Sequence, residues 1–110
     1  MILHICKKSA WNQAQNDGEY RGDTLESEGF IHCSTSQQVV EVADSLFKGA
    51  QDLLLLVIDE RKVVSAIKFE DPGNGNLYPH IYGPLNLDAI TKTVDFYPDL
   101  NGNFILPDFK

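Results

Sequence analysis

Basic residues are scarce in this sequence. Nine lysines and arginines stand against sixteen aspartates and glutamates, and the formal charge at pH 7 is −7. A surface with this balance exerts no long-range attraction on a nucleic-acid backbone or on an anionic membrane. The sequence therefore argues against nucleic acid and membranes as partners, and we expect any anionic group to be held by local contacts.

Long hydrophobic runs and cysteine-rich motifs are also absent. No apolar stretch approaches the roughly 18 residues that span a bilayer, and the first residues lead into Lys7 and Lys8 without the order of a signal peptide. We therefore expect a cytoplasmic protein. Cys6 and Cys33 are too few for a disulfide scaffold, so we expect two small buried side chains, with a single bridge between them as the alternative.

The apolar content is sufficient for one core. Hydrophobic residues make up 43% of the 110 residues, and the glycine-rich stretches are short and lie between periodic segments, as turns do. These features predict a single domain over residues 1–110. A monomer or a weak homodimer is expected, because the apolar residues near the C-terminus pack either on the same chain or on a second copy. These residues are Phe104, Ile105, Leu106 and Phe109.

Hydrophobic periodicity predicts an α+β fold. Strands are expected over 2–6, 30–34, 53–58, 65–70, 78–82 and 90–96, and helices over 9–15 and 39–47, with one further helical turn near Leu25. The run from Leu53 to Ile58 is apolar throughout, which is typical of a central strand covered on both faces. Strands and helices do not alternate in a βαβ rhythm, which favours α+β over α/β.

Local signals add detail to these elements. Ser9 is the expected N-cap of the first helix. Two pairs before the second helix have the capping-box spacing, namely Ser34/Gln37 and Thr35/Gln38. Pro79 has no N–H to donate, so it predicts an edge or irregular position for the strand 78–82. The loop 19–28 is the least regular part of the first half and is a candidate functional loop.

All three histidines lie in predicted strands, and the two-residue period of a strand assigns each to a face. His32 lies on the same face as Ser34, and His80 lies on the same face as two tyrosines. If the three strands are neighbours, one sheet face gathers His4, His32, Ser34, His80, Tyr78 and Tyr82. This arrangement predicts a cleft with a shared histidine site.

Other interpretations compete with a shared site. Each histidine alone fits a core or edge residue that one hydrogen bond satisfies. Zinc is disfavoured, and no metal is expected, because His32 and Cys33 point to opposite faces and no zinc-type motif occurs. Cys33 is a poor nucleophile for the same reason. Ser34 and His32 have two interpretations. Either they act as a nucleophile and its base, or Ser34 only caps the helix that follows.

Several segments carry a resemblance to a known family. The segments are His4-Ile5-Cys6, 28–35, 54–59 and 78–85. Together they resemble the family described as domain of unknown function 952 (DUF952), over nearly the whole chain. The resemblance implies an ADP-ribosyltransferase-like fold, in which two small mixed or antiparallel β layers with two or three helices surround a cleft that binds NAD in the larger superfamily. It implies no settled activity.

A more distant likeness is to the tRNA 2′-phosphotransferases, which share that fold. The strand His4-Ile5-Cys6 resembles their His-Gly-Thr strand, and residues 30–34 resemble their His-Val-His-Leu-Ser strand. Ser34-Thr35-Ser36 is similar to the Ser-Thr-Ser motif of arginine-type ADP-ribosyltransferases. Phe30 and Glu28 stand where the phosphotransferases have a histidine and an arginine, so an RNA 2′-phosphate is not the expected substrate.

The first hypothesis for function is an enzyme, a transferase or hydrolase that acts at the nicotinamide ribose of NAD or a related nucleotide. The catalytic candidates are His4, His32 and His80, and the ligand-binding candidates are Ser34, Thr35, Tyr78, Tyr82 and Arg21. A carboxylate is needed near the cation that develops on the ribose, and Glu28 and Glu70 are both candidates. The alternative is a non-catalytic module that binds a nucleotide or small metabolite in the same cleft.

Overall fold

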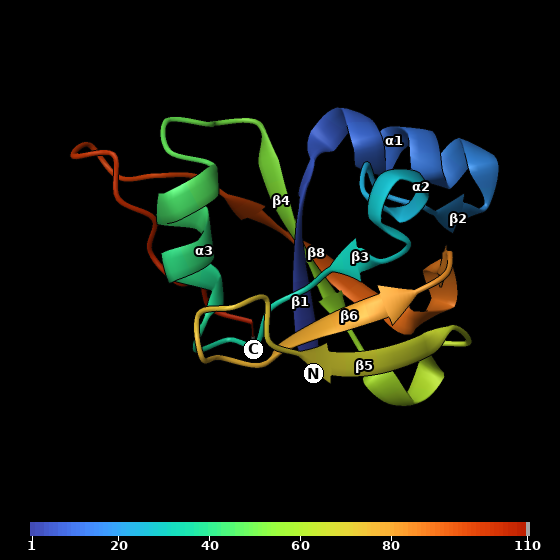
Figure 1. Cartoon of the computed structure of the whole chain (residues 1–110). Helices are drawn as coiled ribbons and strands as arrows, with labels where there is room; N and C mark the ends of the chain where they lie inside the picture. Colours follow the sequence, from blue (N-terminus) through green and yellow to red (C-terminus); the bar gives the residue numbers. More distant parts are fainter. Residues whose placement is uncertain (110) are drawn as a thin grey trace.

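Three antiparallel sheets and three α-helices are present in the described part of the chain, residues 1–109 of a computed structural model (Figure 1). The strands are β1 (Ile2–Lys7), β2 (Glu19–Tyr20), β3 (Ile31–His32), β4 (Leu53–Ile58), β5 (Ala66–Glu70), β6 (Tyr78–Tyr82), β7 (Leu85–Asn86) and β8 (Ile90–Phe96). The helices are α1 (Lys8–Asp17), α2 (Leu25–Glu28) and α3 (Val39–Leu46), with 3₁₀ turns η1 (Glu60–Lys62) and η2 (Leu87–Ala89). The α+β expectation is therefore confirmed.

Strand β4 is the centre of the first sheet, which has the order β1-β4-β8. It pairs antiparallel with both neighbours, and all six of its residues are buried. Each fully buried aliphatic side chain of this kind contributes about 1.5 to 3 kcal/mol of transfer free energy. The apolar run 53–58 is thus the doubly covered strand that the sequence predicts.

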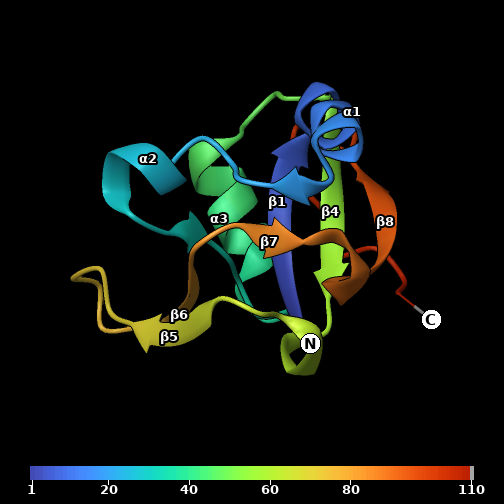
Figure 2. The same cartoon turned by 90° about the vertical axis from the view of Figure 1, so that its right-hand side faces the viewer.

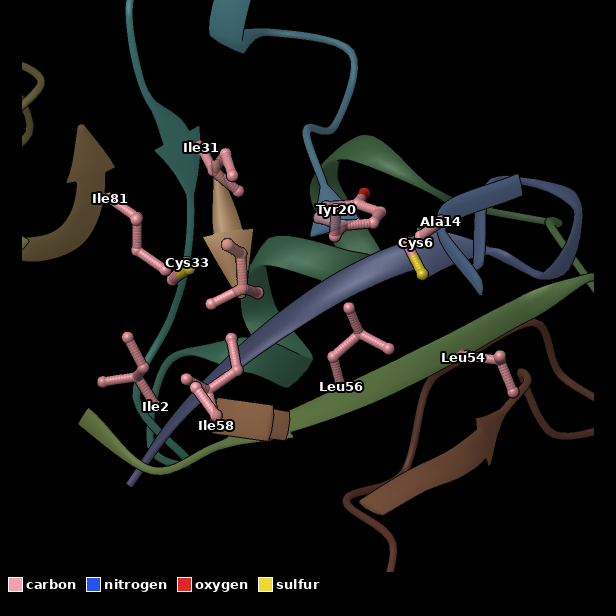
Figure 3. Packing of buried hydrophobic residues seen from close by; sticks show 12 residues of the cluster. Ile2, Cys6, Ala14, Tyr20, Ile31, Cys33, Leu54, Leu56, Ile58 and Ile81 are labelled. Atoms are coloured by element: carbon pink, nitrogen blue, oxygen red, sulfur yellow. The ribbon is translucent and has the colours of Figure 1, made fainter. Parts of the chain in front are cut away.

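The two faces of β4 belong to two different hydrophobic clusters. Leu54, Leu56 and Ile58 pack in the cluster drawn in Figure 3, which also contains residues of β1, β2, β3 and β6. The alternate residues of β4 pack in a second cluster with Val39 and Ala43 of α3. Figure 1 shows the same division, with α3 on one side of this sheet and the β2–β7 pair on the other.

The second three-stranded sheet has the order β3-β6-β5, so β6 is its central strand. The expectation of an edge position for this strand was wrong. The backbone oxygen of Pro79 accepts a hydrogen bond from the Cys33 N–H at 3.0 Å. The nitrogen of Pro79 faces the same neighbour, because N and O of one residue point to the same side in an antiparallel strand. The missing N–H therefore ends the β3 ladder after His32 instead of excluding β6 from the sheet centre.

Two further local expectations require correction, and one strand pair was not predicted. Ser9 is not an N-cap, because α1 follows β1 directly and the Lys8 N–H is satisfied by the Asp52 carbonyl at 2.8 Å. The strand around His32 spans only residues 31–32. The short pair β2–β7, which runs across the β1–β4 side of the molecule in Figure 2, has no periodic signal, because two residues are too few to show a period.

The chain after β8 packs on its own body through two phenylalanines. Phe104 is buried, its ring centroid lies 4.7 Å from that of Phe96, and its N–H donates to Asp44 at 2.8 Å. Phe109 is partly buried and packs against the same hydrophobic cluster. Ile105 and Leu106 are exposed. No helix among residues 1–109 is long and apolar enough to cross a membrane.

Gly83, between β6 and β7, is a position where a side chain is not tolerated. Its φ is 153°, and a Cβ there would lie 2.5 Å from Ser65 Oγ and 3.0 Å from Ser65 Cβ. Ser65 Oγ is also fixed by donating to the Pro84 carbonyl at 2.8 Å. We expect Gly83→Ala to lower the free energy of unfolding by about 2 to 3 kcal/mol, measured by urea denaturation.

The matched control is Gly73→Ala. Gly73 also has a positive φ, 122°, but no atom lies within 4 Å of a Cβ built there. The control carries only the backbone cost, about 1 kcal/mol. Equal losses in the two variants would disprove the steric argument at Gly83.

Candidate functional site

A cleft of about 750 Å³ lies between β1, the loop before α2, β3 and α3. All three histidines line it, together with Ser34 and Tyr78. The predicted shared cleft is therefore present. The prediction that one sheet face carries all three histidines was wrong, because His4 belongs to the β1-β4-β8 sheet, whereas His32 and His80 belong to the β3-β6-β5 sheet.

The two sheets meet where β3 ends. Leu3 and Ser34 form an isolated antiparallel bridge in which each N–H donates to the other carbonyl at 2.8 Å. The next segment turns into α3, and the Gln38 side chain accepts a hydrogen bond from the Thr35 N–H at 3.0 Å. This contact is the glutamine half of the Thr35/Gln38 capping box. The bridge and the turn fix Ser34 at the wall of the cleft.

His32 and His80 are direct cross-strand partners, and their ring centroids are 5.3 Å apart. Phe30 covers them: its ring stacks on His80 at 4.1 Å with an interplanar angle of 16° and meets His32 edge-on at 4.8 Å. Ile31 and Ile81 point the other way, into the core. The strand period therefore assigned these faces correctly, and we call Phe30, His32 and His80 the histidine cluster.

His80 is buried and is oriented by a carboxylate from the neighbouring strand. Its Nδ1 lies 2.9 Å from Glu70 Oε1, and the Tyr82 hydroxyl donates to the same oxygen at 2.5 Å. The Tyr82 hydroxyl and then the imidazole of His80 lower the pKa of Glu70. A carboxylate only accepts hydrogen bonds, so Nδ1 carries a proton, and the lone pair of the neutral ring is on Nε2.

The Nε2 atom of His80 has no hydrogen-bond partner among residues 1–109. No buried polar side-chain atom in this part of the chain lacks a partner, so Nε2 reaches accessible space. His80 lines the cleft, and the cleft is therefore where this lone pair is available. A histidine with one nitrogen held by a carboxylate and the other free is the arrangement used for general acid–base catalysis.

His32 is the exposed member of the histidine cluster. Its Nε2 lies 3.1 Å from Glu28 Oε1. Glu28 ends the short helix α2, and Gly29 then reverses the chain with a φ of 89°. The Thr24 hydroxyl donates to the Phe30 carbonyl at 2.7 Å and so ties α2 to β3. The two candidate carboxylates of the sequence thus contact one histidine each.

His4 is buried, and both of its ring nitrogens have protein partners. Nδ1 lies 2.5 Å from the His32 carbonyl oxygen, and Nε2 lies 2.7 Å from the Tyr20 hydroxyl. The carbonyl only accepts, so Nδ1 is the protonated nitrogen. Burial lowers the pKa of His4 from 6.5 to about 4. His4 is therefore neutral at neutral pH and acts as a positioning residue between β1 and β3.

Both cysteines are free and buried. Burial raises the pKa of Cys6 to about 12 and also raises the pKa of Cys33. Neither thiol is ionised at neutral pH, so the expectation of two buried side chains without a bridge is confirmed. No group of three or more metal-ligating side chains that could hold an ion occurs within residues 1–109.

Three of the predicted ligand-binding residues are not part of the cleft lining. Thr35 donates its N–H to Gln38, Tyr82 contacts Glu70, and Arg21 pairs with Glu19 at 3.1 Å. The predicted site residues that do line the cleft are His4, His32, His80, Ser34 and Tyr78.

Several cleft residues were missed from the sequence. They are Tyr20, Asp23, Glu41, Val42 and Phe47. Tyr20 and Asp23 lie in the loop 19–28, from which only Arg21 and Glu28 were selected by sequence, and no periodic pattern in this loop marks the other positions. The amphipathic pattern of α3 shows which of its residues share a face, but not what that face contacts. Its cleft residues can be identified only when the position of α3 beside β1 is known, and that position is set by the tertiary structure.

The buried neutral state of His4 predicts a pH-dependent stability. The unfolded chain takes up a proton at His4 near pH 6.5, whereas the folded chain does so only near pH 4. The free energy of unfolding therefore falls as the pH is lowered from 6.5 towards 4, by up to about 3 kcal/mol from this residue. Urea denaturation at several pH values measures the loss.

His4→Asn is the matched variant, because its amide keeps a donor for the His32 carbonyl and does not titrate. We expect a smaller dependence on pH between 6.5 and 4 than in the wild type. Nitrogen NMR of the wild type should report the Nδ1-protonated neutral tautomer of His4 at pH 6. A doubly protonated ring at that pH would contradict this assignment.

Comparisons with known proteins identify relatives of the chain. The crystal structure of protein CC0527 from Caulobacter crescentus superposes with a TM-score of 0.87 at 30% identity, over 96% of this chain and 93% of that chain. The solution NMR structure of the same protein gives a TM-score of 0.81 at 30% identity, over 93% and 89%. No curated protein matches. The family model described as "Protein of unknown function (DUF952)" matches residues 5–93, and the chain belongs to this family.

Proposed function

We propose that the protein is a transferase or hydrolase that cleaves the ribosyl bond of an NAD-related or nucleoside-type small molecule. The observation that carries the proposal is the His80–Glu70 pair, which leaves Nε2 of a buried histidine free at the cleft. General acid–base catalysis by such a histidine contributes about 10²- to 10⁴-fold to a rate.

The chemistry of ribosyl cleavage fits the charge of the cleft. When the bond between C1′ and the ring nitrogen breaks, the electron pair leaves with the ring and positive charge develops on the ribose. Asp23 and Glu28 line the cleft as carboxylates, and preorganised negative charge stabilises such a cation. His80 Nε2 takes the proton of the attacking water or acceptor hydroxyl as its oxygen bonds to C1′.

The cleft also has aromatic surface for a planar leaving group. Tyr78 and His80, which alternate along β6, both line the cleft, and Phe30 stacks on the His80 ring. The arrangement of two antiparallel sheets joined at a cleft agrees with the ADP-ribosyltransferase-like fold that the sequence resemblance implies. That resemblance supports NAD or a fragment of it as the first substrate to test.

The test is nicotinamide release from NAD and from nicotinamide riboside by the purified chain. We expect release from at least one of them, and we expect His80→Asn to lower kcat/KM by about 10²-fold or more. Because His80 is buried, Glu70→Gln serves as a second variant that keeps the imidazole; it should lower kcat by about tenfold with little change in KM, as an orienting partner does.

The control variant is Lys92→Gln, which lies on β8 outside the cleft lining and should leave activity unchanged. Full activity in folded His80→Asn would refute the role of His80. Binding of these compounds without any release would favour the non-catalytic binding module instead.

A further inference from the structure

We infer that the ligand of this cleft is a hydroxylated small molecule without phosphate groups that is neutral or positively charged, such as a nucleoside, and not a nucleotide or dinucleotide. The inference rests on the proposed function, because it concerns the same cleft. It narrows the substrate class from the charges and the free polar groups that surround the ligand.

Carboxylates outnumber cations in the cleft lining. Asp23, Glu28 and Glu41 line it, and Lys7 is the one lysine or arginine among the lining residues within 1–109. Asp23 and Glu41 have no hydrogen-bond or ion-pair partner in this part of the chain. A phosphate in the cleft would face these carboxylates at short range, and like charges brought together disfavour binding.

The guanidinium groups that bind phosphate well are held elsewhere. Arg21 pairs with Glu19 at 3.1 Å, and Arg61 makes a bidentate contact with Asp59 at 3.1 Å. Neither arginine lines the cleft. A pyrophosphate would therefore have a single flexible lysine as its cationic partner, without the fork geometry that an arginine provides.

Two mostly buried polar residues at the cleft point to a ligand with hydroxyl groups. Ser34 and His80 are each only 5% exposed. Ser34 Oγ and His80 Nε2 have no hydrogen-bond partner among residues 1–109, yet no buried polar side-chain atom in that range is left unsatisfied. Both atoms therefore open to the cleft that their residues line. Hydroxyls donate to Nε2 and to carboxylates and accept from Ser34, which matches this set of groups.

The cleft lining also has an apolar part. Val42 and Leu46 of α3, Phe47 directly after that helix and Ala10 of α1 contribute apolar surface to the lining. A ligand that uses both kinds of surface has a flat apolar part and a hydroxylated part. A nucleoside has this composition, and its sugar hydroxyls suit the carboxylates.

The decisive comparison uses three probes that differ in phosphate content: nicotinamide riboside, nicotinamide mononucleotide and NAD. Affinities are measured by NMR titration of the full chain. Each titration point uses freshly added ligand, so that cleavage of the ligand does not affect the measured binding. We expect the riboside to bind at least about tenfold more tightly than the mononucleotide. Its affinity should fall as salt is added, because the attraction is between a cation and carboxylates.

Charge variants test the cause of this preference. Asp23→Asn and Glu41→Gln should each weaken riboside binding by about threefold to fivefold, and Glu41→Lys should narrow or reverse the preference over the mononucleotide. Glu26→Gln is the matched control, because Glu26 is exposed on α2 and does not line the cleft. It should leave all three affinities unchanged.

Three outcomes would overturn the inference: tighter binding of the mononucleotide or NAD than of the riboside, an equal effect of Glu26→Gln and Glu41→Gln, or no riboside binding at millimolar concentration. These results are separate from a failure of the proposed function. A riboside that binds selectively but is never cleaved would refute the enzymatic role and leave the ligand class intact.

Discussion

Two backbone hydrogen bonds between Leu3 and Ser34 join the two three-stranded sheets, and the cleft depends on this junction. Strand β3 pairs with β6 for two residues and then, beyond the proline that cannot continue the ladder, leaves for β1. The change of partner brings the His4 ring to the carbonyl of His32.

The three histidines have one chemistry and three environments. His4 is buried with both nitrogens occupied, and the loss of solvation keeps it neutral. His80 is similarly buried, but only Nδ1 has a hydrogen-bond partner, so Nε2 is open to the cleft. His32 is exposed and pairs with Glu28. Residue type alone does not separate these roles; the number of satisfied nitrogens and the degree of burial do.

Much of the architecture could be predicted from local pattern. The apolar run 53–58 needs cover on both faces wherever it lies, so its central position follows from its composition. The alternation in 30–34 assigned Ile31 to the core and His32 to the other face, as found. The predictions for Ser9 and Pro79 were wrong for tertiary reasons. The Asp52 carbonyl accepts from the Lys8 N–H at the start of α1, where Ser9 was expected to cap the helix. The β3 ladder ends before Pro79, so the missing N–H of this proline does not exclude β6 from the sheet centre.

The candidate site was predicted in part. The three histidines and Ser34 were selected because the two-residue period of the predicted strands placed them on one face, and they do line one cleft. Glu28 and Glu70 were equal candidates, since a sequence cannot say which carboxylate reaches which imidazole. Tyr20 and Asp23 lay in a loop without a period, and the α3 wall required knowledge of where the helix stands.

The sequence by itself determined the strands that must be buried, the face on which each histidine lies within its strand and the acidic balance of the surface. These properties follow from the side chain and its immediate neighbours, because strand period and burial preference are local. Only the tertiary structure decided which strands pair, which carboxylate orients each histidine and which charges surround the cleft. Those properties depend on contacts between residues that are not neighbours in the chain. Leu3 and Ser34 are far apart in the sequence, and Glu70 and His80 lie on neighbouring strands whose register is set by the whole sheet.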